Sequence, residues 1–342
     1  MPHWLIKSAV QRVISGLPAS HKFNEFFQNR ITRSLELTDS RFEARLEHCR
    51  RHFDHLREFR PELQDGFSVV EIGTGWFPVV PVGLFLCGAG PIWTFDISPL
   101  LGSERVGNML RKFNTYAQDG RLRRILPGTQ PSRVKVLQEL VEHLPASPVE
   151  TLARLNITAQ TREAQRTGLP PSSIDLFTST GVLEYIPGDV LREILVECQR
   201  VGRDGAVQSH YLNLVDQFSY FDSSITAFNF LKYSARAWKY LNSPLTWQNR
   251  FRISDFRRLF RESGYRVVKE TCTRGNRDDL KKVRLAPEFQ HYREEDLLVL
   301  FAWIAAVAEN REQAPSLSRH DQKLLAEDAP GKRQAQVQPQ KR

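Results

Sequence analysis

Residues 69–75 read Val-Val-Glu-Ile-Gly-Thr-Gly, and residues 93–96 read Trp-Thr-Phe-Asp. The first four residues form a short apolar run with β-branched bias, which is typical of a buried parallel strand. Gly73 and Gly75 then allow a tight turn in which a ligand can approach the backbone, because neither residue carries a Cβ. The pattern therefore predicts a strand that ends in a ligand-binding turn.

A helix and a second strand follow this turn. Pro78 suits the first turn of a helix, where a missing N–H costs nothing, and residues 79–87 supply an apolar body. A second strand at 92–95 finishes in Asp96. A strand, a glycine turn, a helix and a strand with a terminal acid form a nucleotide-binding half-unit, in which the carboxylate accepts hydrogen bonds from both ribose hydroxyls.

The turn does not fit a dinucleotide. A Gly-x-Gly-x-x-Gly fingerprint has its third glycine where this chain has Pro78, and Trp76 and Phe77 crowd the turn. Glu71 adds negative charge, which would repel a pyrophosphate and attract a ligand that carries an ammonium and a sulfonium. At these residues the sequence resembles the class I S-adenosylmethionine-dependent methyltransferases, whose first motif runs acid-x-Gly-x-Gly after strand one. Phe77 stands where the fullest form of that motif often has a third glycine.

Two later segments strengthen this resemblance, which covers roughly residues 66–308. Residues 167–177 (T-G-L-P-P-S-S-I-D-L-F) are similar to the family's entry into strand four. Residues 182–187 (V-L-E-Y-I-P) are similar to its V-L-E-H-I-P stretch, with Tyr185 at the usual histidine. Glu163 falls where the family has an acid that holds the adenine amino group.

The resemblance implies S-adenosylmethionine as the cofactor and methyl transfer as the reaction. It implies an α/β fold, with a Rossmann-like, mostly parallel sheet of seven strands and flanking helices. The residues expected to bind the cofactor are Glu71, Gly73, Thr74, Gly75, Asp96, Glu163 and Leu183.

Methyl transfer asks little covalent chemistry of the protein, which mainly holds the acceptor in line with the methyl–sulfur bond. A hydroxyl acceptor also needs a general base. His210, in the expected fifth strand, and Asp216 form a candidate base and orienting pair, although a structural core histidine is an equal alternative. Tyr185 is the third catalytic candidate, because ligands of open α/β sheets bind where the strands end. Its alternative is a packed aromatic.

Residues 211–251 hold eleven aromatic side chains. This density predicts a cap insertion over the sheet edge that binds a small-molecule, glycan or lipid-type acceptor, methylated at oxygen. The alternative is that these rings bury one another. They are Tyr211, Phe218, Tyr220, Phe221, Phe228, Phe230, Tyr233, Trp238, Tyr240, Trp247 and Phe251.

Composition does not favour a nucleic-acid partner. The net charge of +9 is spread over 342 residues, and residues 311–342 contribute +3 of it. Residues 178–181 read Thr-Ser-Thr-Gly, not the Asp/Asn-Pro-Pro-aromatic motif of amino-methylating nucleic-acid enzymes. An RNA-directed methyltransferase and a catalytically silent Rossmann-like interaction protein remain the alternatives.

Cysteine and histidine usage predicts no metal site. The four cysteines include no close pair, which also argues against a disulfide framework. His48, His52 and His55 lie on one helix face, and we expect them at a solvated edge without a metal. No signal peptide is visible, and the apolar run at 297–308 is too short to span a bilayer, so we expect a cytoplasmic protein with no metal.

We expect an N-terminal helical region (1–65), a methyltransferase domain (66–308) with the cap at 211–251, and a disordered polar tail (309–342). Within the first region a helix should run from about Thr38 to just before Pro61. Residues 4–17 are amphipathic and could contact a membrane surface. Later expected strands include 155–158, 206–214, 265–271 and 297–306, and the oligomeric state is left open.

Overall fold

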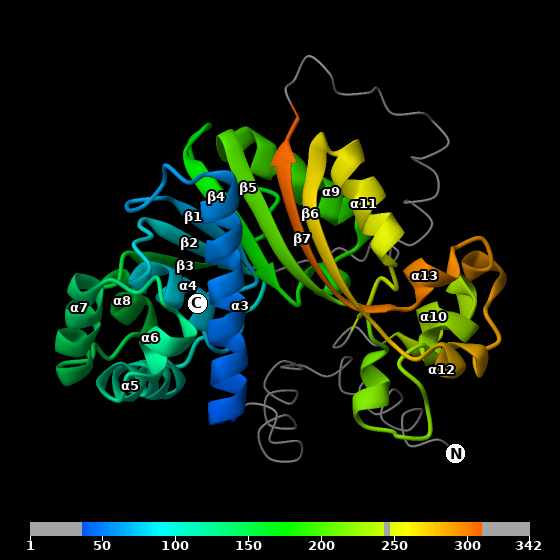
Figure 1. The fold of residues 1–342 in the computed structure, drawn as a ribbon, viewed down its shortest axis with the longest axis horizontal. Helices are drawn as coiled ribbons and strands as arrows, with labels where there is room; N and C mark the ends of the chain where they lie inside the picture. Colours follow the sequence, from blue (N-terminus) through cyan, green and yellow to red (C-terminus); the bar gives the residue numbers. More distant parts are fainter. Residues whose placement is uncertain (1–35, 243–246, 310–342) are drawn as a thin grey trace, which may run out of the picture.

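The structure is a computed structural model that describes residues 36–242 and 247–309. In this part of the chain, strands form one seven-stranded sheet in the order β3-β2-β1-β4-β5-β7-β6 (Figure 1). β1 to β5 are parallel, and β7 is antiparallel to both of its neighbours. The predicted Rossmann-like, mostly parallel sheet is confirmed. Its strands are β1 (Val69–Ile72), β2 (Ile92–Asp96), β3 (Ile157–Thr161), β4 (Ile174–Thr180), β5 (Gly202–Asn213), β6 (Tyr265–Arg274) and β7 (Val299–Ala308).

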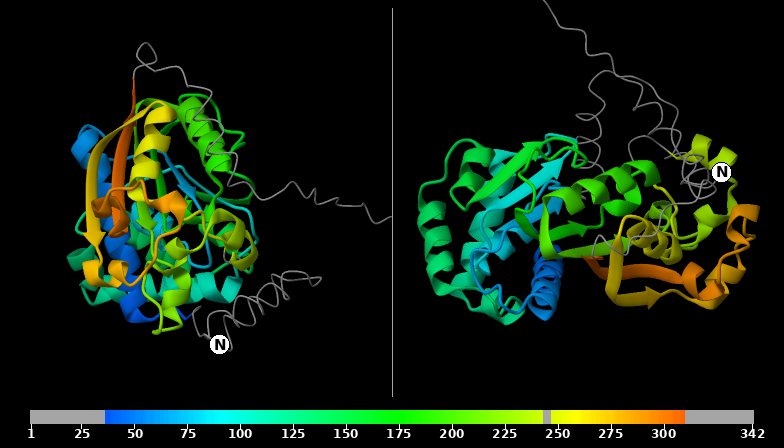
Figure 2. Two further views of the ribbon diagram at one scale, coloured as in Figure 1. Left: turned by 90° about the vertical axis from the view of Figure 1, so that its right-hand side faces the viewer. Right: turned by 90° about the horizontal axis from the view of Figure 1, so that it is seen from above.

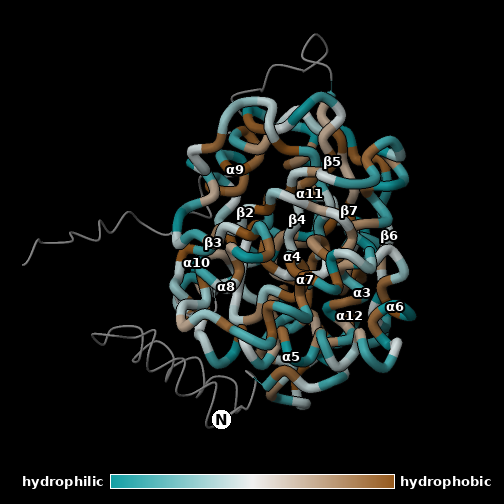
Figure 3. The backbone as a smooth tube through the Cα atoms, turned by 90° about the vertical axis from the view of Figure 1, so that its left-hand side faces the viewer, coloured by the Kyte–Doolittle hydropathy of each residue, from teal (hydrophilic) through white to brown (hydrophobic). Residues whose placement is uncertain are grey.

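Helices cover both faces of the sheet (Figure 2). Successive side chains of a strand point to opposite faces, so Val69 of β1 packs in one core, whereas Val70 and Ile72 pack in another. Hydrophobic segments gather inside the fold and hydrophilic ones mark the outer loops (Figure 3). The first face carries α3 (Asp39–Phe59), α4 (Val79–Leu86), α5 (Ser103–Gln118), α6 (Arg121–Ile125), α7 (Pro131–Glu142) and α8 (Pro148–Ala153), and the second carries α9 (Gly188–Val201) and α11 (Ile253–Glu262).

A cap with its own apolar core lies at the opposite side of the molecule from α5–α8 (Figure 1). Its first half follows β5 and lies within the predicted insertion at 211–251. Its second half comes from the connection between β6 and β7, which the sequence did not suggest. The cap elements are η2 (Gln217–Tyr220), η3 (Asn229–Lys232), α10 (Ala235–Leu241), α12 (Arg277–Lys281), η4 (Pro287–Phe289) and α13 (Glu294–Leu297).

A buried cation stands where the cap joins the sheet. Arg252 is fully buried and donates hydrogen bonds to the carbonyl oxygens of Leu214 and Leu297, both at 2.9 Å, and of Val299. Burial lowers the pKa of Arg252 to about 10, so the guanidinium stays charged at neutral pH. Three backbone carbonyls, one after β5 and two at the junction of α13 and β7, therefore solvate one charge.

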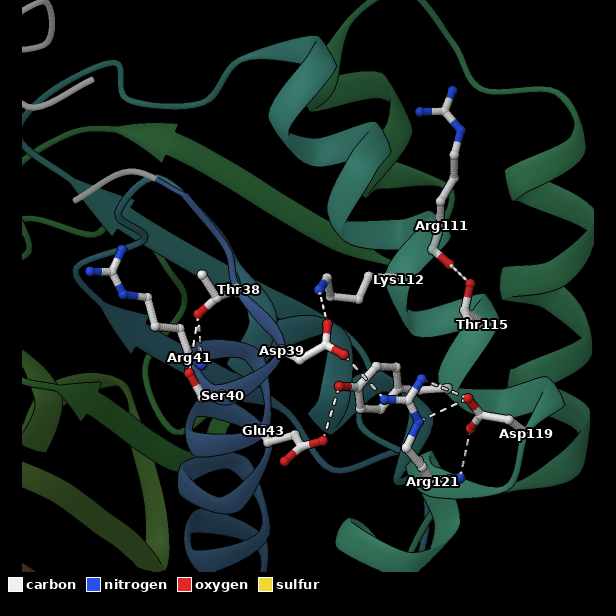
Figure 4. Close-up of polar contacts among 11 residues, drawn as sticks. Thr38, Asp39, Ser40, Arg41, Glu43, Arg111, Lys112, Thr115, Asp119 and Arg121 are labelled. Carbon is white, nitrogen blue, oxygen red and sulfur yellow. Dashed lines mark hydrogen bonds and ion pairs between the residues drawn. The ribbon is translucent and has the colours of Figure 1, made fainter. Parts of the chain in front are cut away.

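The helix predicted from Thr38 to Pro61 is confirmed as α3, which begins at Asp39 under a Thr38 N-cap. Asp39 accepts hydrogen bonds from Lys112 and, at 3.3 Å, from Arg121, which fixes the start of α3 against α5 and α6 (Figure 4). Arg60, at its end, donates to the carbonyl oxygen of Asp204 early in β5 at 2.9 Å. α3 therefore runs antiparallel to β5, and its first half lies toward the carboxyl edge of the sheet.

The expected solvated histidine edge of α3 is wrong. His52 is 0% exposed and His55 is 4% exposed, because α3 packs directly on β4 and β5. The Nδ1 atoms of both rings lie 2.8 Å from Ser209 Oγ, and His52 Nε2 lies 3.1 Å from Thr180 Oγ1. Burial lowers the pKa of His52 far below its usual range and that of His55 to about 4, so both rings are neutral. Within the described ranges, no group of three or more His, Cys, Asp or Glu side chains is placed to hold a metal ion.

Element boundaries differ from expectation in two places. The third strand begins at Ile157 because Asn156 takes a left-handed conformation, with φ of 56°, that ends the preceding turn. The last strand begins at Val299, because the short helix α13 occupies the start of the expected strand. Residues 4–17 and the expected tail from 310 onward lie outside the described residues. Among the described residues, no helix combines the length and apolar character needed to cross a membrane.

Candidate functional site

The turn after β1 is built around two left-handed glycines. Gly73 has φ of 85° and Gly75 has φ of 64°. A Cβ on Gly73 would lie 2.5 Å from Val182 Cγ2, so the turn closes against the loop that follows β4. A Cβ on Gly75 would meet open space. The turn therefore brings backbone to the carboxyl ends of β1 and β4 without side chains in the way.

Asp96, at the end of β2, faces this turn. Its Oδ2 accepts a hydrogen bond from the Gly75 N–H at 2.9 Å, and its Oδ1 accepts one from the Ser98 N–H at 3.0 Å. The residue is half-buried and lines an open cavity of about 120 Å³ beside Thr74. The remaining wall of this cavity comes from Ser98, Pro99, Leu100, Leu101, Pro148, Val149, Ala159, Gln160 and Thr161. The structure thus brings Thr74, Gly75 and Asp96 together at one cavity.

An exposed apolar side chain follows Asp96. Ile97 is 80% exposed, the highest exposure of any large hydrophobic side chain among the described residues. Covering the exposed side chain with a flat apolar group would be favourable, because it removes apolar surface from water. The loop after β2 therefore offers an acid for hydroxyl groups and, next to it, an apolar surface for a ring.

A buried acid of β1, Glu71, interacts electrostatically with Arg45 of α3. Glu71 is buried, and in the described structure its Oε2 has no hydrogen-bond partner. Burial raises the pKa of Glu71 well above its usual range, Asp96 raises it further, and Arg45 of α3 opposes both. Solvent reaches Arg45, yet the protein around its guanidinium lowers the pKa of that group. No ion pair joins Glu71 and Arg45 within the part of the chain described.

A second buried acid lies past the end of β4, in η1 (Leu183–Tyr185). Glu184 is 3% exposed, its Oε1 accepts a hydrogen bond from the Asn213 N–H at 3.3 Å, and its Oε2 has no partner among the described residues. Burial raises the pKa of Glu184 to about 8. A Cβ on Gly181 would lie 3.5 Å from Glu184 Oε1, so the carboxyl group lies beside the backbone that ends β4.

Sequence reasoning missed Arg45 and Glu184. Glu184 stands inside a motif quoted above, but the role there was assigned to its neighbour Tyr185. The available signal was an acid in an apolar stretch just after a parallel strand. Nothing local marks Arg45, because its importance comes from its electrostatic interaction with Glu71, which lies on β1 and far from it in sequence.

A second cavity, of about 260 Å³, lies between α3 and the strands β5, β7 and β6. Four of its eight lining residues carry aromatic rings: the Tyr211 ring lies 5.1 Å from Trp303 and is stacked on Phe301 at 6.2 Å, and His48 is the fourth. The His48 ring lies 4.4 Å from Tyr211, and the Arg51 guanidinium lies 5.4 Å from the centre of Trp303. The other lining residues are Glu47, Thr271 and Thr273.

The structure does not bring His210 and Asp216 together. His210 is fully buried on the face toward α11, with Nδ1 2.8 Å from Ser179 Oγ and Nε2 2.9 Å from Gln208 Oε1. Burial lowers the pKa of His210 to about 3, so the ring has neither a free nitrogen nor a useful basicity. Asp216 caps η2, where its oxygens accept from the Phe218 N–H at 2.9 Å and the Asn229 amide at 3.0 Å. The geometry of both residues is that of structural side chains.

The remaining expected site residues, Glu163, Leu183 and Tyr185, have different surroundings. Glu163 is exposed and stands outside the lining of the Asp96 cavity, whereas Gln160 of β3 forms part of it. Leu183 is buried in the core under α9, and its carbonyl oxygen accepts a hydrogen bond from Asn249 at 2.9 Å. Tyr185 is partly buried next to Glu184, at the expected edge of the sheet.

Many of the cap aromatics bury one another, as the alternative above foresaw. The Phe230 and Trp238 rings meet edge to face at 5.9 Å, and the Trp238 N–H donates to the Gln248 carbonyl oxygen at 3.2 Å. Tyr220, Phe221 and Tyr240 are exposed. The buried members are Phe218, Phe228, Phe230, Trp238 and Phe251.

No protein-family model matches the chain, and a search of curated proteins finds no match. Among solved structures, the chain is similar to a S-adenosylmethionine-dependent methyltransferase from Methanosarcina mazei, with 13% identity, a TM-score of 0.40, and coverage of 72% of this chain and 94% of that one. A putative sarcosine dimethylglycine methyltransferase from Galdieria sulphuraria gives 13% identity and a TM-score of 0.41, with 75% and 84% covered. Phosphoethanolamine N-methyltransferase 2 from Haemonchus contortus gives 13% and 0.43, with 86% and 61% covered. The strand order of this chain, with β7 reversed between β5 and β6, is the Rossmann-like, mostly parallel arrangement expected from the sequence.

Proposed function

We propose that the chain is an S-adenosylmethionine-dependent methyltransferase that acts on a small-molecule acceptor. The observation that carries the proposal is the Asp96 carboxylate at the wall of an open cavity, held by the N–H groups of Gly75 and Ser98. A carboxylate offers about four lone-pair sites. Two therefore remain for the two hydroxyls of a ribose.

The surrounding residues fit the other parts of the cofactor. Ile97 offers an apolar surface for the adenine ring. No ion pair joins Glu71 and Arg45 in the described structure, so both side chains are available to a ligand. Glu71 would bind the ammonium and Arg45 the carboxylate of the amino-acid end of the cofactor. A buried carboxyl group without a partner is costly in its ionised form, so a bound ammonium would stabilise the charge on Glu71.

When bound, the cofactor supplies a methyl group on a sulfonium. The chain then has to hold the acceptor in line and take its proton. Glu184 suits the second task, because its carboxyl lies beside Gly181, and the adjoining Val182 approaches Gly73. The ionised carboxylate of Glu184 would accept the proton of a hydroxyl acceptor, whose oxygen is the atom that the sequence led us to expect as the methylated one.

The body of the acceptor has room in the cavity between α3 and β5–β7–β6. Aromatic walls and polar rims suit a small molecule, a sugar or a lipid-type group alike. Tyr211 links this cavity to the end of β4, since its carbonyl oxygen accepts the Gly181 N–H at 2.9 Å. We therefore place the acceptor here, and not within the core of the cap.

Calorimetry with S-adenosylmethionine and the full chain tests the proposal. Asp96→Ala should lose charge-assisted contacts of about 1.5–3 kcal/mol, roughly ten- to hundredfold in affinity. Glu139→Ala, which removes an exposed carboxylate of α7, should bind as the wild type does. Absence of binding by the wild-type chain, or full affinity in a folded Asp96→Ala protein, would refute the proposal and favour a catalytically silent Rossmann-like protein.

A further inference from the structure

Three tyrosines lie near the Glu184 carboxyl at the edge of the sheet, and each interacts with it electrostatically. Asn213, at the end of β5, joins two members of this group, because its N–H donates to Glu184 Oε1 at 3.3 Å and its side-chain amide donates to the Tyr220 hydroxyl at 3.2 Å. Tyr211 lies two residues earlier on the same face of β5. Tyr185 follows Glu184 directly in η1. We call Glu184, Tyr185, Tyr211 and Tyr220 the carboxyl–tyrosine cluster.

The cluster is electrostatically incomplete. Within the described ranges, Glu184 Oε2 has no hydrogen-bond partner, and no Lys, Arg or His forms an ion pair with this carboxyl. Burial raises the pKa values of all three tyrosines, and the Glu184 carboxyl adds to each shift. Neither the Tyr185 nor the Tyr211 hydroxyl makes a hydrogen bond in the described part of the chain. A cation bound beside Glu184 Oε2 would stabilise the ionised form of this buried carboxyl group.

We propose that the carboxyl–tyrosine cluster binds a protonated amine, and that the nitrogen of this amine receives the methyl group. An ammonium would donate to Glu184 Oε2 and lie against tyrosine rings, whose faces attract cations. A neutral hydroxyl would leave the carboxylate charge without compensation. The inference rests on the proposed function for the methyl donor and replaces the expected oxygen acceptor with nitrogen.

The proton balance of the reaction closes on the same carboxyl. The acceptor R–NH₃⁺ gives one proton to ionised Glu184 and becomes R–NH₂. The nitrogen lone pair then forms the bond to the methyl carbon, while the carbon–sulfur bond breaks and its electron pair stays on sulfur. The products are R–NH₂–CH₃⁺, the neutral thioether and protonated Glu184, which returns its proton to solvent.

Two isosteric probes, n-butylammonium and n-butanol, separate the cation from the hydroxyl. Saturation-transfer NMR on the full chain, with and without S-adenosylhomocysteine, should show at least roughly tenfold tighter binding of the ammonium, as expected for a desolvated charge pair. Glu184→Gln should abolish this preference, whereas Glu193→Gln, an exposed carboxylate on α9, should retain it. Tyr220→Phe keeps the ring and should retain the preference, whereas Tyr220→Leu should weaken it severalfold.

Methyl transfer from labelled S-adenosylmethionine to a panel of amines and matched alcohols completes the test, with products identified by mass. Transfer to amines, lost in Glu184→Gln, would support the inference. Equal affinity for the two probes, or transfer to alcohols alone, would overturn it. A retained ammonium preference in a chain that binds no S-adenosylmethionine would keep the amine site but refute the proposed methyltransferase function.

Discussion

Replacing Gly73 with alanine tests the close approach between the β1 turn and the β4 loop. At φ of 85° an L-residue costs about 1–2 kcal/mol. The new Cβ would also lie 2.5 Å from Val182 Cγ2 and 2.9 Å from Cγ1, an overlap that costs about 1–3 kcal/mol. The less flexible unfolded chain returns about 0.4–1 kcal/mol. The free energy of unfolding should therefore fall by about 2–4 kcal/mol.

Gly75→Ala is the matched control, because Gly75 shares the left-handed conformation but faces open space. Only the backbone cost applies there, so its loss should be about 1 kcal/mol. Val182→Ala removes both methyl groups, and in the double variant with Gly73→Ala it should recover about 1–3 kcal/mol of coupling energy. Urea denaturation of the wild type and the four variants measures these values. Equal losses for the two glycine variants, or no recovery in the double variant, would refute the packing argument.

Five further outcomes can be measured on the same protein. Glu184, whose pKa is raised to about 8 by burial, must lose its proton to act as a base, so turnover should rise roughly tenfold from pH 7 to 9 in the wild type and stay flat in Glu184→Gln. The folded protein keeps this proton up to about pH 8, whereas the unfolded chain releases it near pH 4.5. The contribution of Glu184 to the free energy of unfolding is therefore full below pH 4.5 and is lost as pH rises through about 8. Denaturation at pH 6 and 9 should show this loss in the wild type and not in Glu184→Gln. Arg45→Gln should weaken S-adenosylmethionine roughly ten- to hundredfold but leave adenosine, which lacks the amino-acid end, unaffected in calorimetry. Asp216→Ala should lower the free energy of unfolding by about 1–3 kcal/mol, because two donors lose their acceptor, with cofactor affinity unchanged in the folded protein. Turnover should survive EDTA, since the described residues contain no metal-binding group; loss of turnover restored by one divalent ion would contradict this.

The parts of the fold that could be predicted are those with local causes. A short apolar run before Gly73 and Gly75, and an acid at the end of the next run, predict two strands and the turn between them without reference to distant residues. The same holds for α3, whose N-cap at Thr38 and following Pro61 bracket a regular apolar stripe. In each case the signal and the structure it specifies lie within about twenty residues.

The parts that could not be predicted depend on partners far away in sequence. His52 is polar at the edge of an apolar stripe, which predicts a solvated residue, yet it is buried because Ser209 accepts or donates its hydrogen bond from 157 positions away. His210 lies in β5, three residues before the strand ends at Asn213, and Ser179 and Gln208 occupy both of its ring nitrogens. Hydrogen-bond satisfaction decides whether a polar residue is structural or reactive, and the sequence of one segment does not contain that information.

The buried guanidinium of Arg252 makes the cap and the sheet a single cooperative unit. Its three acceptors are carbonyl oxygens from the end of β5, the end of α13 and the start of β7, so no segment can leave without exposing a stranded charge to the core. Amide hydrogens on both sides of this junction should exchange only through a common opening. Deleting the cap to widen the acceptor site would therefore unfold the β5–β7 edge of the sheet. The acceptor site would have to be enlarged by replacing side chains along α3 instead.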